Sequence, residues 1–397
     1  MKSMNKKILS AIILTLLGTV AFNSFACSVP VFRFALERWR NAPYEIFILH
    51  KGALTEAEKK IYALMENAQY ERGGFSLFDI DIEKNDERSA KIWEKHKNDN
   101  LPAIVVRYPE WTGAENDAWA GPFTKENAGL VLDSPIRRKI AELIVKGESA
   151  VWLFIESSDK QKNDAALSLI EKELKTLAEK LPLSDMKENE TTTDIQSSSP
   201  VQITKSFKTI TVSRKDPAEK GFLEMLYSSD NKIKEDAPVV IPIFGRGRAL
   251  YPLIGDKIND EQIAGVCSFI LGPCSCQVKE LNPGIDLLIC FDWEKNIFYT
   301  IQNFEVPPIT GFEGFLPATE VKETKPQVVP EKSIEKPAKK IALEKNVEKG
   351  VKSENLMLRN LSLLFAGLAI IIIVFTLAAI KKKKIGSNVE NAKEDKP

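Results

Sequence analysis

Four of the five cysteines of this chain lie close together in the sequence, at Cys267, Cys274, Cys276 and Cys290. Their spacing is C-x6-C-x-C-x13-C. Thiols in such a pattern can form structural disulfides, exchange disulfides with a substrate, or hold a soft metal ion. The four are therefore the redox or disulfide candidates of this chain.

Each of these three interpretations has support in the residues. In an oxidising compartment, disulfides would stabilise the fold, and four cysteines leave three pairings open. A bridge between Cys274 and Cys276 would be strained and easily reduced, and the nearby Lys279 would favour a thiolate. Four thiolates suit zinc, an iron–sulfur cluster or copper(I). Because the two C-x2-C pairs of common zinc modules are missing, we commit to no metal and to no cofactor.

A second candidate is the turn FGRGRAL, in which Arg246 and Arg248 flank Gly247. Backbone N–H groups and guanidinium groups at such a turn can bind an anion. The alternative is a hairpin turn with solvated arginines. The turn lacks the Gly-Lys-Ser/Thr ending of a nucleotide-binding P-loop.

Composition excludes several classes of function. The chain has only two His, which makes multi-His metal chemistry improbable, and it contains no G-x-S-x-G or H-E-x-x-H hydrolase signature. We expect His96, in a Lys-rich helix, to be solvated, whereas His50 lies at the end of a predicted strand. With 55 basic and 55 acidic residues, the chain is no basic nucleic-acid coat.

Both ends of the chain indicate a membrane protein. Residues 1–26 combine a basic start, an apolar run and small residues before Cys27, which is typical of a signal peptide and makes Cys27 a lipidation candidate. The segment 356–380 contains the uncharged run 361–380, which is long enough to cross a bilayer as a helix. Four consecutive lysines open the tail, 381–397. We therefore expect one membrane span, an exported N-terminal side and a cytoplasmic tail.

Two segments have the composition of irregular chain. Residues 317–355 alternate Lys and Glu with prolines and have no aromatic residue, which predicts a disordered stalk. Residues 185–199 are rich in Ser and Thr and predict an exposed insertion.

The exported part shows a similar order of elements twice, as predicted from apolar runs, helical spacing and capping residues. The first half contains strand 44–50, helix 56–67, strand 75–82, helix 88–96, strand 103–108 and helix 134–146. The second contains strand 150–156, helix 164–181, strand 203–213, helix 217–227, strand 239–244, strand 249–253 and helix 259–271.

This order, with an x-Pro step before the third strand of each half, resembles the thioredoxin fold. The resemblance implies an α/β protein with two thioredoxin-like domains, at 27–149 and 150–316. In that family the proline is cis and faces the active site, which makes Pro102 and Pro238 the cis-proline candidates. A generic mixed α/β sheet is the competing interpretation.

The chain departs from the family at the active site. A redox-active thioredoxin carries Cys-x-x-Cys just after the first strand, where a helix N-terminus lowers the thiol pKa. The corresponding stretches here begin at His50 and Glu156 and read HKGA and ESSD. Both domains are therefore expected to be redox-silent at this position and to act as binding or structural modules.

We expect a membrane-anchored, bacterial-type envelope protein whose exported part binds or scaffolds a protein partner without catalysis. The alternative is a thiol–disulfide redox or metal-handling protein that acts through Cys274 and Cys276. No nucleic-acid partner is expected.

Two further segments contain apolar or aromatic residues that predict packing or binding contacts. The loop 109–132 contains Trp111, Trp119 and Phe123, and we expect it to form an exposed aromatic surface for a partner. The segment 31–39 has helical spacing of apolar residues, and we expect it to pack on the first domain or to lie near the membrane if Cys27 is lipidated.

Overall fold

The structure is a computed structural model that describes residues 29–84, 87–183, 201, 204–274, 278–298, 305–313 and 322–323. These residues belong to one compact unit, Met1–Val328. The predicted signal peptide, Cys27, Cys276, the 185–199 insertion, most of the predicted stalk and the 356–380 segment lie outside the described residues. Within the described ranges, no helix has the length and apolar character needed to cross a bilayer.

The first of two mixed α/β sheets has four strands in the order β2-β1-β3-β4. β1 and β2 are parallel, whereas β3 is antiparallel to both β1 and β4. The strands are β1 Tyr44–His50, β2 Phe75–Asp81, β3 Ala103–Arg107 and β4 Asp117–Pro122.

Both faces of this sheet are covered, so β1 is apolar at nearly every position. Ile46 and Ile48 point into one core cluster together with residues of helices α3 and α5, and Phe47 and Leu49 point into the cluster on the α4 side. The helices are α3 Glu56–Arg72, α4 Glu87–His96 and α5 Lys125–Leu132. α3 begins at a capping box, in which the Thr55 side chain accepts from the Glu58 amide and the Glu58 carboxylate accepts from the Thr55 amide.

The second sheet runs in the order β10-β8-β7-β5-β6-β11, with β9 paired to β7. β5 and β6 are parallel, and β7 is antiparallel to β5. The strands are β5 Ala150–Ile155, β6 Phe207–Val212, β7 Val239–Phe244, β8 Arg248–Ala249, β9 Leu253–Ile254, β10 Ile285–Asp286 and β11 Lys322–Glu323. β11 falls at the start of the segment predicted as a stalk.

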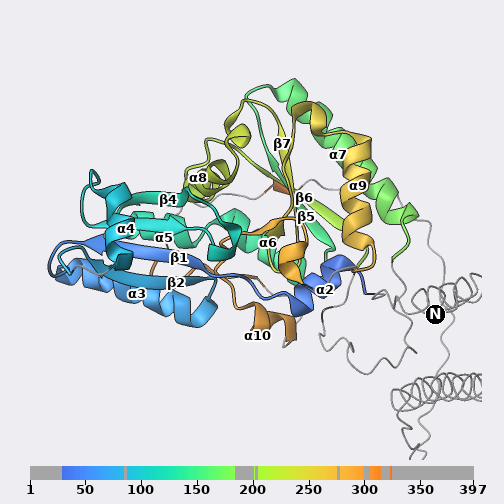
Figure 1. The fold of residues 1–397 in the computed structure, drawn as a ribbon. Helices are drawn as coiled ribbons and strands as arrows, with labels where there is room; N and C mark the ends of the chain where they lie inside the picture. Colours follow the sequence, from blue (N-terminus) through green and yellow to red (C-terminus); the bar gives the residue numbers. More distant parts are fainter. Residues whose placement is uncertain are drawn as a thin grey trace, which may run out of the picture. The chain divides into compact units, whose positions relative to one another are not determined.

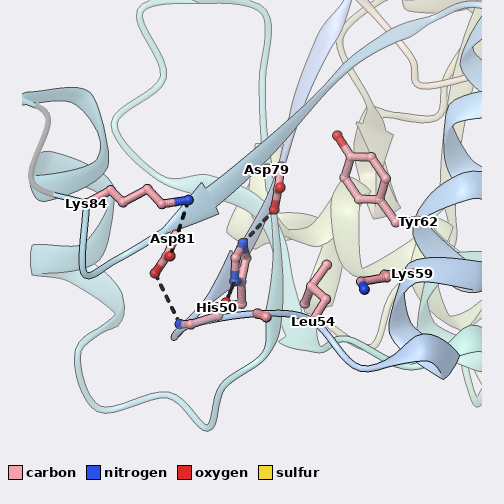
Figure 2. Close-up of a pocket in the computed structure, with 9 residues that line it drawn as sticks. His50, Leu54, Lys59, Tyr62, Asp79, Asp81 and Lys84 are labelled. Atoms are coloured by element: carbon pink, nitrogen blue, oxygen red, sulfur yellow. Dashed lines mark hydrogen bonds and ion pairs between the residues drawn. The ribbon is translucent and has the colours of Figure 1, made fainter.

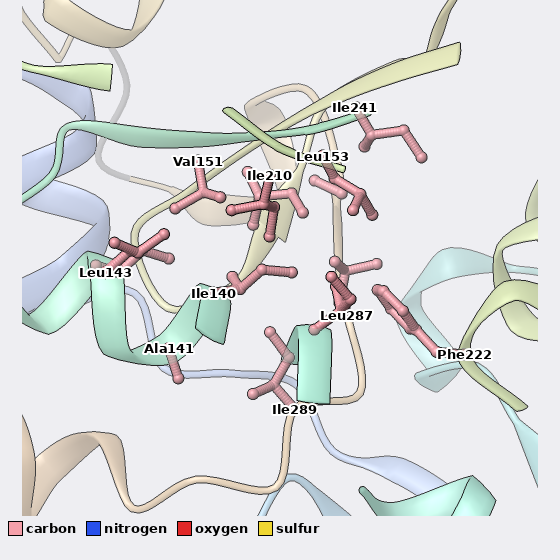
Figure 3. Packing of buried hydrophobic residues seen from close by; sticks show 14 of the residues in the cluster. Ile140, Ala141, Leu143, Val151, Leu153, Ile210, Phe222, Ile241, Leu287 and Ile289 are labelled. Carbon is pink, nitrogen blue, oxygen red and sulfur yellow. The ribbon is translucent and has the colours of Figure 1, made fainter. Parts of the chain in front are cut away.

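Helices cover both faces of the second sheet as well. α7 and α9 lie side by side on one face (Figure 1), where Trp152 and Phe154 of β5 contribute to the core. On the other face, Val151 and Leu153 pack with residues of α6 and α8 (Figure 3). The helices are α6 Pro135–Val145, α7 Lys160–Lys180, α8 Lys220–Ser229 and α9 Asp260–Leu271.

Two helices pack on a different sheet from the one expected. α6 was predicted to close the first half, but its apolar residues lie in the core of the second sheet, and α5 takes that place on the first. Helix α2, Val31–Arg38, was expected on the first domain, but Phe32 and Phe34 lie in the core cluster of α7 and α9. The apolar stripe of a helix specifies that it is buried, not which sheet buries it.

The segment after β10 passes between the two sheets and contributes to both cores. Leu287, Ile289 and Phe291 lie in the core cluster of the second sheet, whereas Leu288 and Cys290 lie in that of the first. Neighbouring side chains of an extended chain point in opposite directions, which makes this possible. The chain continues through α10, Trp293–Phe298. Further on, Val306 lies in the core of the second sheet, and Ile309 and Phe312 are buried in that of the first.

The expected aromatic loop is largely structured. Residues 109–132 contain a short 3-10 helix, η1 Glu110–Thr112, followed by β4 and α5. Phe123 is buried, and the Trp119 indole donates to Glu224 at 2.6 Å. Trp111, 37% exposed, is the one of the three that meets the expectation of an exposed ring.

Candidate ligand pocket

A pocket of about 360 Å³ opens where β1 and β2 end and the chain turns towards α3 (Figure 2). Its lining includes His50 from β1, Asp79 and Asp81 from β2, and Lys59 and Tyr62 from α3. Parallel strands bring their carboxyl ends to the same edge of a sheet, so β1 and β2 deliver these polar side chains together. The position is the one that follows the first strand, where the sequence reads HKGA.

Strand alternation explains why these side chains share one face. Asp79 and Asp81 are two residues apart and point to the same side, whereas Ile80 between them packs on the opposite face with Phe47. His50 is paired in register with Asp81 and lies on the same face as Ile48.

His50 is held by both of its ring nitrogens. Nδ1 lies 2.6 Å from the carbonyl oxygen of Gly52, and Nε2 lies 2.6 Å from Oδ1 of Asp79. A carbonyl oxygen only accepts, so Nδ1 is the donor in its contact with Gly52. Both ring nitrogens are engaged by groups of the chain itself. The two contacts hold the imidazole in place and fix the turn that follows β1.

The Asp81 carboxylate fixes the same turn. It accepts from the amides of Gly52 and Glu83, each at 3.2 Å. The Glu83 amide, with smaller contributions from Gly52 and Lys84, lowers the pKa of Asp81. Gly52 has φ 72°, in the left-handed region that favours glycine, so the tight approach of this turn to Asp81 is specified by residue type.

The opposite wall of the pocket comes from α3. Burial, with the nearby Asp79 and Glu66 carboxylates, raises the pKa of Tyr62, whose phenol thus stays neutral. Lys59, one turn before it in the helix, pairs with Glu56 at 2.8 Å. None of the described residues that line the pocket carries a thiol or an aliphatic hydroxyl group. Its described lining therefore offers hydrogen-bonding groups and charges of both signs to a ligand.

The equivalent position after β5 is closed by hydrogen bonds. The amide of Ser158 donates to Oδ1 of Asp236 at 2.7 Å, and its hydroxyl donates to the other carboxylate oxygen. The Ser158 hydroxyl is the largest cause of the lowered pKa of Asp236. Arg214 adds three bonds, to the carbonyl oxygens of Glu156 at 2.9 Å, Ile233 at 2.5 Å and Ala237 at 2.8 Å. Hydrogen bonds therefore hold the ESSD loop in place.

The two cis-proline candidates lie at equivalent places. The Leu101–Pro102 bond is cis, and among the described residues it is the one cis bond, so Ala237–Pro238 is trans. Leu49 pairs with Ala103, which brings Pro102 opposite His50 at the next step. Ile155 pairs with Val239 in the same way, and Pro238 follows opposite Glu156.

The described cysteines do not form one cluster. Cys267 and Cys274 lie in the core under α9, whereas Cys290 lies in the core of the first sheet. No disulfide joins these three to one another, and the described residues contain no group of three or more potential metal ligands. Burial raises the pKa of Cys267 and of Cys290 to about 12, which makes both thiols poor nucleophiles. Cys276 lies outside the described residues.

Arg246 and Arg248 are buried. The FGRGRAL turn was predicted either to bind an anion or to carry solvated arginines, and the structure shows the two side chains bound to other parts of the chain. Arg246 donates to the carbonyl oxygen of Leu36 at 2.7 Å and pairs with Glu294 at 2.7 Å. Arg248 pairs with Asp286 at 3.1 Å and its guanidinium lies 5.5 Å from the Trp39 ring centroid. The acceptors that these two arginines meet are carbonyl oxygens and carboxylates of the chain's own distant segments.

Lys279 was expected to favour a thiolate at Cys274 or Cys276, but its ammonium group binds other partners. Its ammonium group pairs with the Asp286 carboxylate and donates to the carbonyl oxygen of Arg40 at 2.5 Å. Lys279, Arg248 and Asp286 thus form a buried charged group that joins the N-terminal segment to β10.

Sequence reasoning missed Asp79, Asp81 and Tyr62 as pocket residues. The signal for the two carboxylates was available, since acidic residues two apart at the end of an apolar strand share one face. The prediction of a solvated His96 was also wrong. This side chain is buried, and its ring nitrogens lie 2.7 Å from Asp99 and 3.1 Å from Asp117.

Comparisons with known proteins give little further information. No family model matches the chain, and no curated protein matches it significantly. Among solved structures, full-length ERdj5 is similar over 64% of this chain and 33% of that chain, with 7% sequence identity and a TM-score of 0.18. This chain thus spans about a third of ERdj5, and a TM-score this low supports no argument.

Proposed function

We propose that this chain is a membrane-anchored envelope protein whose exported part is a non-catalytic binding module built from two thioredoxin-like domains. The strand order supports the fold proposal, because β2-β1-β3-β4 and β6-β5-β7-β8 have the same order and the same pattern of parallel and antiparallel neighbours. An x-Pro step precedes β3 and β7 at matching positions.

One observation carries the functional proposal. In the thioredoxin family a nucleophilic cysteine follows the first strand. At this position the first half of the chain has the His50 pocket, and the second half has the ESSD loop, which hydrogen bonds hold in place. A pocket of about 360 Å³ is of the size that small-molecule or side-chain ligands occupy, within the roughly 300–1,000 Å³ common for such sites. The proposed role is therefore binding of a ligand through hydrogen bonds and charge, in place of the family's thiol chemistry.

The location in the cell is proposed from the ends of the chain. Residues 1–26 would direct export, 356–380 would anchor the protein, and the lysines that open 381–397 would hold the tail in the cytoplasm. The proposed partner is another protein of the envelope.

A disulfide-exchange assay on the full chain tests the non-catalytic assignment. We expect no catalysed reduction of a disulfide substrate, and native Cys267 and Cys290 should resist a thiol-specific reagent until denaturant is added, because both thiols are buried. Turnover that disappears in Cys274→Ser or Cys276→Ser would overturn the proposal and establish the redox alternative. Metal retained by the purified chain and lost in those variants would support metal handling instead.

Ligand binding at the pocket is tested separately. A fragment library is screened by thermal shift against the full chain and against Asp79→Asn. We expect hits whose effect is lost in the variant, with Glu83→Gln, outside the pocket lining, as the matched control. Hits that stabilise all three chains equally would show that the pocket is not the binding site.

A further inference from the structure

A second pocket of about 170 Å³ lies between α4 and the end of β3, and its lining is strongly cationic. Lys91 and Lys95 come from one face of α4, four residues apart, and Arg107 comes from the end of β3. Asp117 is the one carboxylate among the described residues that line it. The formal charge of these four side chains is therefore positive before His96 is considered.

The negative charge of Asp117 is already shared. Its Oδ2 lies 3.1 Å from Nε2 of His96, and its Oδ1 lies 3.7 Å from Nε of Arg107. His96 is buried, and its Nδ1 lies 2.7 Å from Asp99, so the imidazole is held between two carboxylates. The partly buried His96–Asp117 contact is part of the pocket lining and occupies Oδ2 of Asp117.

The side chains of Arg107 and Lys95 keep hydrogen-bond donors for a ligand. The Arg107 guanidinium forms an ion pair with Asp117 at 3.7 Å, a distance too long for a hydrogen bond, so its N–H groups are not used by this contact. Lys95 donates to the backbone carbonyl oxygen of Glu115 at 2.6 Å, which positions its ammonium group without neutralising its charge. With three cationic side chains and one carboxylate in its described lining, the pocket keeps a positive formal charge.

We propose that this pocket binds a small oxyanion of the phosphate class, either free or as the terminal phosphate of a larger molecule. The planar guanidinium of Arg107 offers paired donors that match two oxygens of a phosphate, and Lys91 and Lys95 add point charges from the helix. A volume of about 170 Å³, below the roughly 300 Å³ at which pockets for larger ligands begin, admits one such group. The site is separate from the His50 pocket, and the proposal does not depend on the function proposed for that pocket.

The test is equilibrium dialysis of the full chain, in neutral detergent and at constant ionic strength, against radiolabelled inorganic phosphate. We expect saturable binding that Arg107→Gln weakens by about tenfold or more, as the loss of charge-assisted hydrogen bonds predicts. Lys91→Gln should weaken it by a smaller factor. Lys97→Gln is the matched control, because Lys97 is on the same stretch of chain but pairs with Glu94 at 2.7 Å and does not line the pocket.

Near-ultraviolet circular dichroism of each variant verifies that the fold is retained. A water-soluble, short-chain phosphatidic acid in competition with phosphate separates the sources: preference for the lipid indicates a headgroup site, and preference for phosphate indicates a free-anion site, and either supports the proposal. Absence of saturable binding below about 10 mM phosphate in the folded wild-type chain would overturn it. Equal affinities for Arg107→Gln and Lys97→Gln would overturn it as well.

Discussion

Arg137 shows how a single buried residue organises the boundary between the two sheets. Its guanidinium donates to the carbonyl oxygens of Leu130 at 2.7 Å and Val131 at 2.6 Å, which closes the C-terminal end of α5. It also reaches the carbonyl oxygen of Leu288 at 3.3 Å, in the segment between the sheets. Burial lowers the pKa of Arg137, but five N–H donors in a cage of oxygens keep the charge satisfied.

Glu219, beside this arginine, gives a prediction for pH. The side chain is fully buried, and its Oε1 accepts from the Ile136 amide at 2.8 Å. Burial raises its pKa from the ordinary 4.5 to about 7. The folded chain therefore retains a proton that the unfolded chain releases, so the stability from this group is complete below pH 4.5 and is lost as the pH rises through 7.

The change that tests this is Glu219→Gln, which removes the titration. Between pH 4.5 and 8, we expect the wild type to lose on the order of 3 kcal/mol of unfolding free energy relative to the variant. Urea unfolding curves at a series of pH values measure the difference. Parallel profiles for the two chains would contradict the assignment.

At the scale of the element, the packing of α8 on α5 depends on one glycine. A Cβ added to Gly221 would lie 2.5 Å from the carbonyl oxygen of Leu130 and 3.1 Å from its Cβ. Both obstacles are fixed by the backbone, so neither can move aside. A Cβ on Gly265 of α9 would meet nothing within 4 Å.

These two glycines make a matched pair of substitutions. We expect Gly221→Ala to destabilise the fold by about 1–3 kcal/mol, as overpacking does. Gly265→Ala, which only improves helix propensity, should stabilise it by up to about 1 kcal/mol. Chemical denaturation of both variants measures the two signs, and equal stability of the two would show that α8 does not approach α5 closely.

The buried strands and the capped helices could be predicted from the sequence. Runs such as YEIFILH and VVIPIF are apolar on both faces, and the predicted 44–50 and 239–244 are the observed β1 and β7. Ser134 at the start of α6 and Thr55 at the start of α3 are local signals that need no tertiary context.

β4 was not predicted from the sequence, because it is an edge strand rich in small residues. α5, which follows it, fell in the same stretch that was interpreted as a loop. The sequence of β4, DAWAGP, has neither an apolar run nor alternation, and pairing with β3 alone defines it. Of the candidate pocket, the position of His50 at a strand end followed from the pattern. Its contacts did not, since Asp79 comes from another strand and Tyr62 from a helix.

At the scale of the whole molecule, the two sheets share structural parts. α2 precedes the first sheet in the chain but packs on the second, and Ile309 and Phe312 follow β10 of the second sheet but pack on the first. Arg72 of α3 donates to the carbonyl oxygens of Pro307 at 2.9 Å and Pro308 at 2.8 Å. Each sheet thus takes part of its core from a segment that lies nearer to the other sheet in the sequence.

Neighbouring residues between the sheets test this sharing. Leu287 lies in the second core and Leu288 in the first, so truncating either to alanine removes packing from a different sheet. We expect each variant to lose about 2–5 kcal/mol and to lower the midpoint of one common unfolding transition. Differential scanning calorimetry records the transitions. Two separate transitions, each moved by only one variant, would show that the halves unfold independently.

The position of α2 also has a consequence for biogenesis. The surface that receives Phe32 and Phe34 is built partly by α9, Asp260–Leu271, which the ribosome makes more than 200 residues later. At about 5–20 residues per second, that interval lasts on the order of ten to fifty seconds. During this interval α2, the first helix in the described part of the chain, lacks the part of its docking surface that α9 supplies, so we expect α2 to reach its final position only after α9 has been made.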